Sequence, residues 1–106
     1  MLESEFQKQV VSLAKQCGWL VMHTRPALNR SGKWSTPIQG HRGFPDLVLS
    51  HATRGTVFAE LKGEKGRVAP EQQAWIDTLA AGGCEVHVWR PADLQKIADR
   101  LSEMLD

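Results

Sequence analysis

Apolar residues recur along the chain with two different spacings, and these spacings predict its elements. Apolar positions three or four residues apart, the mark of an amphipathic helix, are found in three segments: residues 2–17, 70–81 and 91–105. In the first segment the apolar stripe is formed by Phe6, Val10, Leu13 and Cys17. Pro70 stands where a helix favours proline, and glycines at positions 18, 82 and 83 are suited to end the first two helices.

Short apolar and partly β-branched runs predict four strands. They cover residues 19–24, 46–50, 56–62 and 84–89. A turn at 51–55 joins the second and third strands as an antiparallel hairpin, whereas the helix at 70–81 implies that the third and fourth strands are parallel. We therefore expect an α/β fold: one domain over residues 1–106, with a mixed four-stranded sheet flanked by helices. The order is αβββαβ with an added C-terminal helix.

Residues 25–43 interrupt this pattern. The stretch is rich in Gly, Pro, Ser and Asn, and it has few large apolar residues. Loops of this length without regular structure are uncommon in small domains and are usually functional or mobile. Its charged side chains are all basic: Arg25, Arg30, Lys33 and Arg42. We expect no regular structure here, poor order without a ligand, and binding of phosphate groups; a merely solvated loop is the alternative.

Composition narrows the class of protein. The 106 residues are 42% hydrophobic and 24% charged, with a formal net charge of +1, which is typical of a globular domain and excludes a uniformly basic coat. No apolar run approaches the roughly 18 residues of a membrane span, and the polar, acidic N-terminus resembles neither a signal nor a transit peptide. We expect a cytoplasmic protein without a membrane partner. Cys17 and Cys84 are expected to be reduced and buried, and the scattered histidines show no zinc-ligand spacing.

The predicted strand at 56–62 carries charged residues on one face. Because side chains alternate, Phe58, Glu60 and Lys62 share one face, while Val57, Ala59 and Leu61 share the other and must face the core. Glu-x-Lys alone is weak evidence, because such a pair on the outer face of a sheet is usually a solvated ion pair.

The preceding strand strengthens the case for a site. Asp46 begins that strand, and the hairpin returns the chain antiparallel through Glu60, so the two carboxylates can converge. Adjacent carboxylates repel, and a hard divalent cation or protonation relieves the repulsion. These oxygen ligands suit Mg²⁺ or Mn²⁺. Lys62 beside such an ion can orient water and neutralise charge on a phosphate.

Two helical residues are further candidates. Glu3 lies three residues before Phe6, on the inward stripe of its helix, and Gln72 lies three before Trp75 on the stripe of the second helix. A carboxylate on a buried stripe needs a partner. Fraying near the terminus is the alternative for Glu3, and capping of its own helical turn is the alternative for Gln72. A nucleotide cofactor is not expected, because the glycine patterns of phosphate-binding and dinucleotide-binding loops are absent.

These motifs, in this order, carry a resemblance to a known family. They are Glu3, Gly43-x-Pro45-Asp46, Glu60-x-Lys62 and Pro70-Glu71-Gln72-x-x-Trp75. Together they resemble the PD-(D/E)xK nuclease superfamily and, more closely, its VRR-NUC (virus-type replication-repair nuclease) domains. The resemblance implies a restriction-endonuclease-like core and Mg²⁺- or Mn²⁺-dependent cleavage of DNA. It also implies that Asp46, Glu60 and the Leu61 carbonyl bind the metal, that Lys62 handles the attacking water, and that Glu3 and Gln72 complete the site, with Glu3 as a further metal ligand.

The resemblance and the charge pattern agree on DNA as the substrate. Candidate DNA-binding residues are Arg25, Arg30, Lys33, His41, Arg42, Lys65 and Arg67. Small stand-alone members of the family imply a homodimer acting on branched DNA such as four-way (Holliday) junctions, in a bacterial or phage-infected cell. A non-catalytic DNA-binding subunit with the same fold is the first alternative, and a metal-dependent phosphatase or small-molecule hydrolase is the second.

Overall fold

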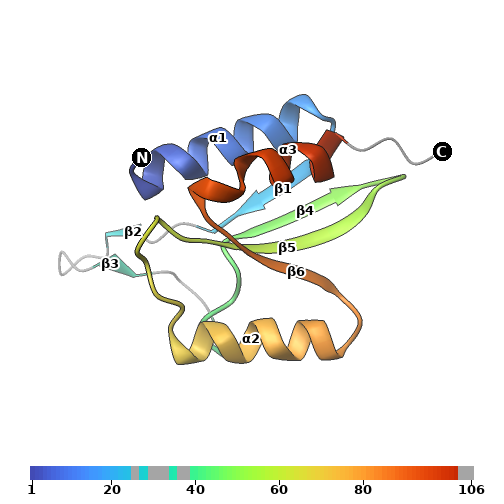
Figure 1. Ribbon diagram of the computed structural model, residues 1–106. Helices are drawn as coiled ribbons and strands as arrows, with labels where there is room; N and C mark the ends of the chain where they lie inside the picture. The colour runs from blue at the N-terminus through green and yellow to red at the C-terminus, as the bar shows by residue number, and fades with distance from the viewer. Residues whose placement is uncertain (25–26, 29–33, 36–38, 103–106) are drawn as a thin grey trace.

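The computed structural model describes residues 1–24, 27–28, 34–35 and 39–102 (Figure 1). The elements in chain order are α1 (Glu3–Gln16), β1 (Leu20–His23), β2 (Ala27–Leu28), β3 (Trp34–Ser35), β4 (Leu47–His51), β5 (Gly55–Leu61), α2 (Pro70–Ala81), β6 (Glu85–Trp89), a 3₁₀ turn η1 (Pro91–Asp93) and α3 (Leu94–Ser102). The predicted α/β fold is confirmed. The ends of the four predicted strands differ from the observed ends by no more than one residue.

Four of these strands form one mixed sheet in the order β1-β4-β5-β6. β1 pairs antiparallel with β4, and β4 pairs antiparallel with β5 in the predicted hairpin. β5 pairs parallel with β6, because α2 carries the chain from the end of one strand to the start of the next. The two central strands are β4 and β5, and both lead toward the candidate site.

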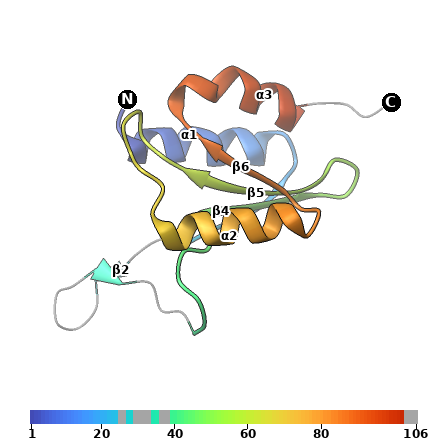
Figure 2. The ribbon, with the colours of Figure 1, turned by 60° about the horizontal axis from the view of Figure 1, so that its bottom comes forward.

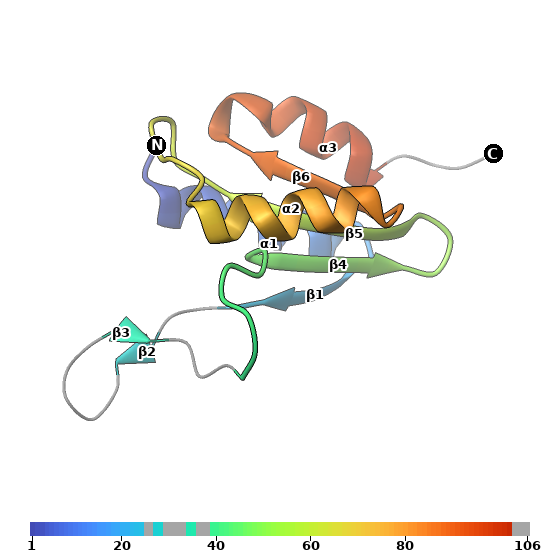
Figure 3. The ribbon, with the colours of Figure 1, turned by 90° about the horizontal axis from the view of Figure 1, so that it is seen from below.

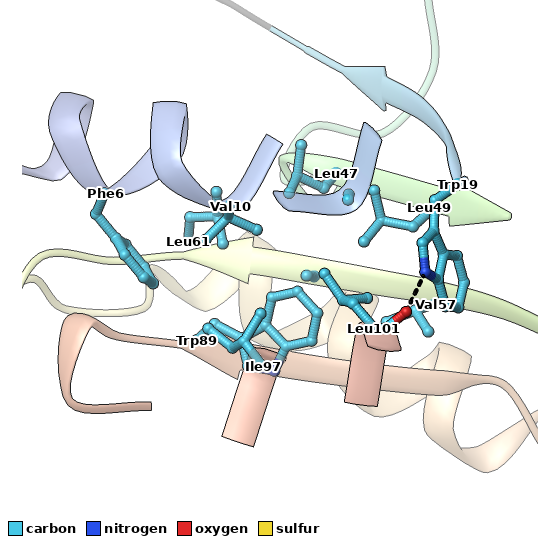
Figure 4. Packing of buried hydrophobic residues seen from close by; sticks show 12 residues of the cluster. Phe6, Val10, Trp19, Leu47, Leu49, Val57, Leu61, Trp89, Ile97 and Leu101 are labelled. Atoms are coloured by element: carbon cyan, nitrogen blue, oxygen red, sulfur yellow. Dashed lines mark hydrogen bonds between the residues drawn. The ribbon is translucent and has the colours of Figure 1, made fainter. Parts of the chain in front are cut away.

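The sheet separates two layers of helices. α1 and α3 cover one face, and α2 lies on the other (Figures 1 and 2). The apolar core lies between the sheet and the α1–α3 layer (Figure 4). It is formed by Phe6, Val10, Ala14, Trp19, Leu47, Leu49, Val57, Ala59, Leu61, Trp89, Ile97 and Leu101. The indole Nε1 of Trp19, the residue before β1, donates a 2.9 Å hydrogen bond to the Leu101 carbonyl and so connects the start of β1 to α3.

Three expectations need correction. Residues 25–43 are not without regular structure, because β2 and β3 form a separate two-stranded antiparallel sheet. Strands of two residues are too short for a period-2 pattern to reveal. The helix predicted at 91–105 begins instead as a 3₁₀ turn, and positions 103–106 lie outside the described residues. Both cysteines are free, but Cys84 is exposed rather than buried because it lies in the turn before β6.

Helix α1 buries a stripe slightly rotated from the predicted one: Phe6, Val10 and Ala14 are fully buried, whereas Leu13 and Cys17 pack at its margin. On α3, Ile97 and Leu101 are fully buried against the molecule's own sheet. Among the helices of the described residues, none has the length and hydropathy needed to cross a membrane.

Candidate active site

The hairpin of β4 and β5 brings two carboxylates together. Its register pairs Leu47 with Ala59, so Asp46, one position earlier, stands opposite Glu60 on the same face of the sheet. Asp46 is held there by a 2.9 Å hydrogen bond that its Oδ2 accepts from the Leu61 backbone N–H. The predicted convergence of Asp46 and Glu60 is therefore present in the structure.

Glu60 is the buried polar residue of this face. Its side chain is only 1% exposed, because it lies beneath α2, whose Gln72 it contacts, rather than on an open surface. Its Oε2 accepts a 3.1 Å hydrogen bond from Gln72 Nε2 and lies 3.8 Å from Lys62 Nζ. Its Oε1 is buried with no hydrogen-bond partner among the described residues. A solvated surface ion pair does not fit these contacts.

Burial raises the pKa values of both carboxyls, and repulsion by Asp46 adds to the rise at Glu60. Desolvation, followed by the charge of Asp46, raises the pKa of Glu60 to about 8, against a smaller lowering effect of Lys62. Desolvation also raises the pKa of Asp46, although the Leu61 N–H bond counteracts it. Two carboxylates that share a poorly solvated site favour a proton or a cation between them. Strongly perturbed pKa values are typical of functional sites.

Gln72 hydrogen-bonds both the buried carboxylate and its own helix. Its Nε2 donates to Glu60, and its Oε1 accepts a 2.8 Å hydrogen bond from the Ala69 backbone N–H at the start of α2. The amide thus caps its own helix and orients the buried carboxylate at the same time. The neighbouring Gln73 instead bonds Asp77 on the exposed side of α2.

The segment before Asp46 packs directly on α2. Gly43 has a φ of +96°, and a Cβ at this position would overlap the Glu71 carbonyl oxygen. The indole Nε1 of Trp75 donates a 3.0 Å hydrogen bond to the Arg42 carbonyl, and the Phe44 ring meets the Trp75 ring edge-on at 5.0 Å. These contacts fix the distance between Asp46's strand and Gln72's helix. The anchoring roles of Gly43 and Trp75 were not predicted, although both stand in the motifs that carry the family resemblance.

Glu3 reaches the edge of the site in an unexpected way. It is exposed rather than buried, because the inward stripe of α1 ends at Phe6. Its Oε1 nevertheless accepts a 3.1 Å hydrogen bond from the Gly63 N–H, immediately after Lys62. Arg90, which sequence reasoning missed, holds the same loop by donating from Nη1 to the carbonyls of Gly63 and Gly66 at 2.9 and 2.7 Å.

The candidate DNA-binding residues divide into two groups. His41, Arg42, Lys65 and Arg67 are exposed on the segments that flank the carboxylates. Arg25, Arg30 and Lys33 lie outside the described residues. An open cavity of about 450 Å³ lies beside α2 and is lined by His41, Arg42, Glu71, Ala74, Trp75 and Thr78.

The site offers few oxygen donors for a metal ion, but their chemistry suits a hard divalent cation. Within the described ranges there is no group of three or more His, Cys, Asp or Glu side chains that could hold a metal, so Glu3 does not join Asp46 and Glu60 in such a cluster. The Lys62 N–H bonds the Trp89 carbonyl of β6, so the backbone groups of Leu61, the preceding residue, point to the opposite side, toward Asp46. Two carboxylates and the Leu61 carbonyl are a donor set compatible with Mg²⁺, which keeps several waters.

Comparison with known proteins identifies the family. Two solved structures titled "VRR_NUC domain" and "VRR_NUC domain protein" share this fold, with TM-scores of 0.67 and 0.62. Each is 21% identical in sequence; the alignments cover 92% and 95% of this chain and 94% and 90% of the other chains, respectively. No curated protein matches the chain significantly. The family model of the VRR-NUC domain matches residues 31–93, more than half of the chain, including Asp46, Glu60, Lys62 and Gln72. The chain therefore belongs to the VRR-NUC family of nuclease domains.

Proposed function

We propose that this protein is a deoxyribonuclease that hydrolyses DNA phosphodiester bonds with Mg²⁺ or Mn²⁺. The observation that carries the proposal is the pairing of Asp46 with buried Glu60, whose Oε1 is left without a partner. An unsatisfied buried carboxylate oxygen is costly, and a cation bound between the two carboxylates would remove that cost. The residues present therefore fit a divalent metal.

Asp46, Glu60 and the carbonyl of Leu61 would hold the ion. When bound, a divalent cation at such a site lowers the pKa of water and polarises a phosphoryl oxygen. Glu3 is the weakest member of the proposed set, because it bonds the Gly63 N–H instead of facing the carboxylate pair.

The surrounding residues position and complete the pair. Gln72 fixes the rotamer of Glu60, and the Leu61 N–H fixes that of Asp46. Lys62, whose side chain is 14% exposed, presents an ammonium group beside Glu60 that can orient the attacking water or neutralise charge developing on the phosphate. Glu3 and Arg90 hold the backbone that follows Lys62 and so limit its movement.

Exposed basic residues on both sides of the site support DNA as the substrate. His41 and Arg42 precede Asp46, while Lys65 and Arg67 follow Lys62, so a strand crossing the carboxylates would meet basic side chains before and after them. We extend the proposal to branched DNA, such as a four-way junction, cut by a homodimer, because a symmetric double cut needs two sites and one such domain supplies one. The protein would act in the cytoplasm of a bacterium or a phage-infected cell, without a nucleotide cofactor.

A three-substrate cleavage assay tests the proposal. Supercoiled plasmid, linear duplex and a four-way junction are each incubated with the protein in Mg²⁺, in Mn²⁺ and in EDTA. The proposal expects metal-dependent cleavage with a preference for the junction. Binding of all three without cleavage would favour a non-catalytic subunit. A small phosphate ester is incubated in parallel, and hydrolysis of this ester with no cleavage of DNA would favour a phosphatase. Equal cleavage of duplex and junction would retain the nuclease and overturn the branched substrate.

A further inference from the structure

Strand β1 exposes two large apolar side chains. Leu20 is 78% exposed and Met22 is 64% exposed, the highest values among the large apolar residues that lie on a helix or strand of the described chain. They are two positions apart on a strand, so both side chains point to the same face. Leu2 and Met1, which are 66% and 49% exposed, lie at the chain terminus. An apolar pair on a regular strand calls for a different explanation from a terminal residue.

The face that carries Leu20 and Met22 is left open by the helices. Val21, between them, packs against the core under α1 and α3, so Leu20 and Met22 lie on the face occupied by α2. α2 runs along β5 and β6, however, and does not extend over β1 (Figure 3). The neighbours of Leu20 and Met22 on β4 are Ser50 and Val48, which lie on the same open part of the sheet.

β1 is also an open edge for backbone pairing. The Thr24 N–H donates to the Asp46 carbonyl, so even-numbered residues direct their backbone groups toward β4. The N–H and C=O of Val21 consequently point to the other side, where no strand of the described chain pairs with β1. Edge strands are usually protected by charged residues or proline, and β1 (LVMH) contains no Lys, Arg, Asp, Glu or Pro.

The geometry points to a second copy of this chain as the occupant of the β1 edge. Two β1 strands related by a two-fold axis at Val21 would run antiparallel, with the two Val21 residues exchanging both backbone hydrogen bonds. In this register Leu20 stands opposite Met22 of the partner subunit, and the reverse contact follows by symmetry. The exposed apolar pair is thus self-complementary, and the sheet continues from one copy into the other.

The alternative register centres on Met22 instead of Val21. It would pair Met22 with itself and leave Leu20 opposite a threonine, Thr24 of the partner subunit. Cross-strand apolar pairs stabilise a sheet more than mixed pairs do. The Val21-centred register therefore uses the exposed surface better, because both apolar side chains of each copy gain an apolar neighbour.

This dimer deepens the proposed function and rests on it in one respect, the use of two sites on one DNA. A two-fold axis perpendicular to the sheet keeps both carboxylate pairs on the same face. With ordinary strand rise and spacing, the two Asp46 positions would be roughly 25 Å apart. Because β1 has four residues, the paired strands alone bury less than the roughly 1,200 Å² of a stable complex. We therefore expect dissociation in the micromolar range.

Sedimentation of matched variants tests the interface without DNA or metal. Leu20→Asp should raise the dissociation constant at least about tenfold, because the charge would lie against Met22 of the partner subunit. Leu2→Asp, at a residue 66% exposed but far along the chain from β1, should sediment as the wild type does. Circular dichroism confirms that both variants fold. A wild type that stays monomeric at about 100 μM, or a Leu20→Asp variant that dimerises normally, would overturn the proposal.

Cross-linking tests the register. In a background with Cys17→Ser and Cys84→Ser, the double variant Leu20→Cys/Met22→Cys should form a covalent dimer on mild oxidation, whereas neither single variant should. Cross-linking by Met22→Cys alone would replace the Val21-centred register with the Met22-centred one. A dimer in sedimentation with no cross-link in any variant would exclude pairing through this edge. A cross-linked dimer that cleaves no DNA would refute the nuclease proposal and leave the interface standing.

Discussion

The two faces of the sheet put burial to different uses, and strand β5 shows both. Toward α1 and α3 it presents Val57, Ala59 and Leu61, which are fully buried among other apolar side chains. Toward α2 it presents Phe58, Glu60 and Lys62, and here the buried group is a carboxylate. One strand therefore supplies the hydrophobic core with one set of side chains and the candidate active site with the other.

The contrast has an energetic meaning. Burial of apolar area on the α1–α3 face stabilises the fold. Burial of Glu60 on the α2 face works against folding whenever the carboxyl must ionise, and the rise of its pKa to about 8 records that cost. Glu60 lies on β5, and the other face of β5 is fully packed in the core. The core therefore holds the strand rigidly although Glu60 itself is destabilising.

The largest expected effect comes from the carboxylates. Asp46→Asn or Glu60→Gln should lower metal-dependent DNA cleavage by about a thousandfold or more while leaving folding and DNA binding largely intact, because both side chains are proposed metal ligands outside the core. Cleavage of a fluorescent DNA substrate at saturating protein measures the loss. Activity above a few per cent in both variants would refute their assignment.

A core variant is the matched control for that comparison. Leu49 is fully buried on the opposite face of the sheet. Leu49→Ala should lower the free energy of unfolding by about 2–5 kcal/mol while each folded molecule keeps its rate of cleavage. The opposite pattern, a stable protein with little activity, would mean that the two faces are not functionally separate.

The second effect is on stability as a function of pH. The pKa of Glu60 is raised from 4.5 to about 8, so between these values the unfolded chain is ionised while the folded one keeps its proton. Stability from this group is therefore fully present below pH 4.5 and is lost as pH rises toward 8, by at most about 1.4 kcal/mol per pH unit.

Urea denaturation in EDTA at pH values from 5 to 8 measures this slope. Glu60→Gln should flatten the curve relative to the wild type, because the variant has no proton to lose at this position. Asp46, whose pKa is also raised, contributes in the same direction. Parallel curves for the two proteins would show that Glu60 is not the group that makes the α2 face costly.

The third effect concerns the amide that orients Glu60. Gln72→Ala should lower kcat for DNA cleavage about tenfold with a smaller change in KM, because it releases Glu60 and one cap of α2 without removing a charge. Gln73→Ala, next to it on the exposed side of the helix, should leave both constants unchanged. Equal effects of the two substitutions would indicate general weakening of α2 instead of lost positioning.

The smallest effect on turnover is expected from the basic segment before the site. Replacing Arg30 and Lys33 with alanine should reduce the salt slope of DNA binding by up to about two units. Cleavage at saturating DNA should change far less than after loss of Lys62, because Lys62 acts on the transition state. An unchanged salt slope with collapsed turnover would place this segment in the catalytic centre.

Much of this arrangement could be predicted from the sequence. The parts that could not be predicted have one physical cause in common. Hairpin register follows from strand alternation, so Asp46 and Glu60 were correctly placed together. Contacts made across the fold leave no local pattern. The hydrogen bonds from Arg90 to Gly63 and Gly66 depend on how β6 packs. The close contact between Gly43 and α2 depends on how α2 packs.

The degree of burial was also beyond local reasoning. Periodicity predicts that Glu3 lies on the inward stripe of α1. The first buried residue of that helix is Phe6, however, so Glu3 precedes the buried part of the stripe and is exposed. Conversely, Glu60 was placed on an outer face, and only the position of α2 makes that face an interior. Periodicity shows which side chains share a face of a helix or strand. Whether that face is buried depends on which other elements pack against it.

Metal binding by the carboxylate pair can be measured without DNA or cleavage, by calorimetric titration of Mn²⁺ into the protein. We expect saturable binding to the wild type and at least a tenfold weaker affinity for both Asp46→Asn and Glu60→Gln, with the affinity of Gln73→Ala unchanged. Binding of equal affinity to the wild type and both carboxylate variants, or no binding to the wild type at millimolar Mn²⁺, would contradict it.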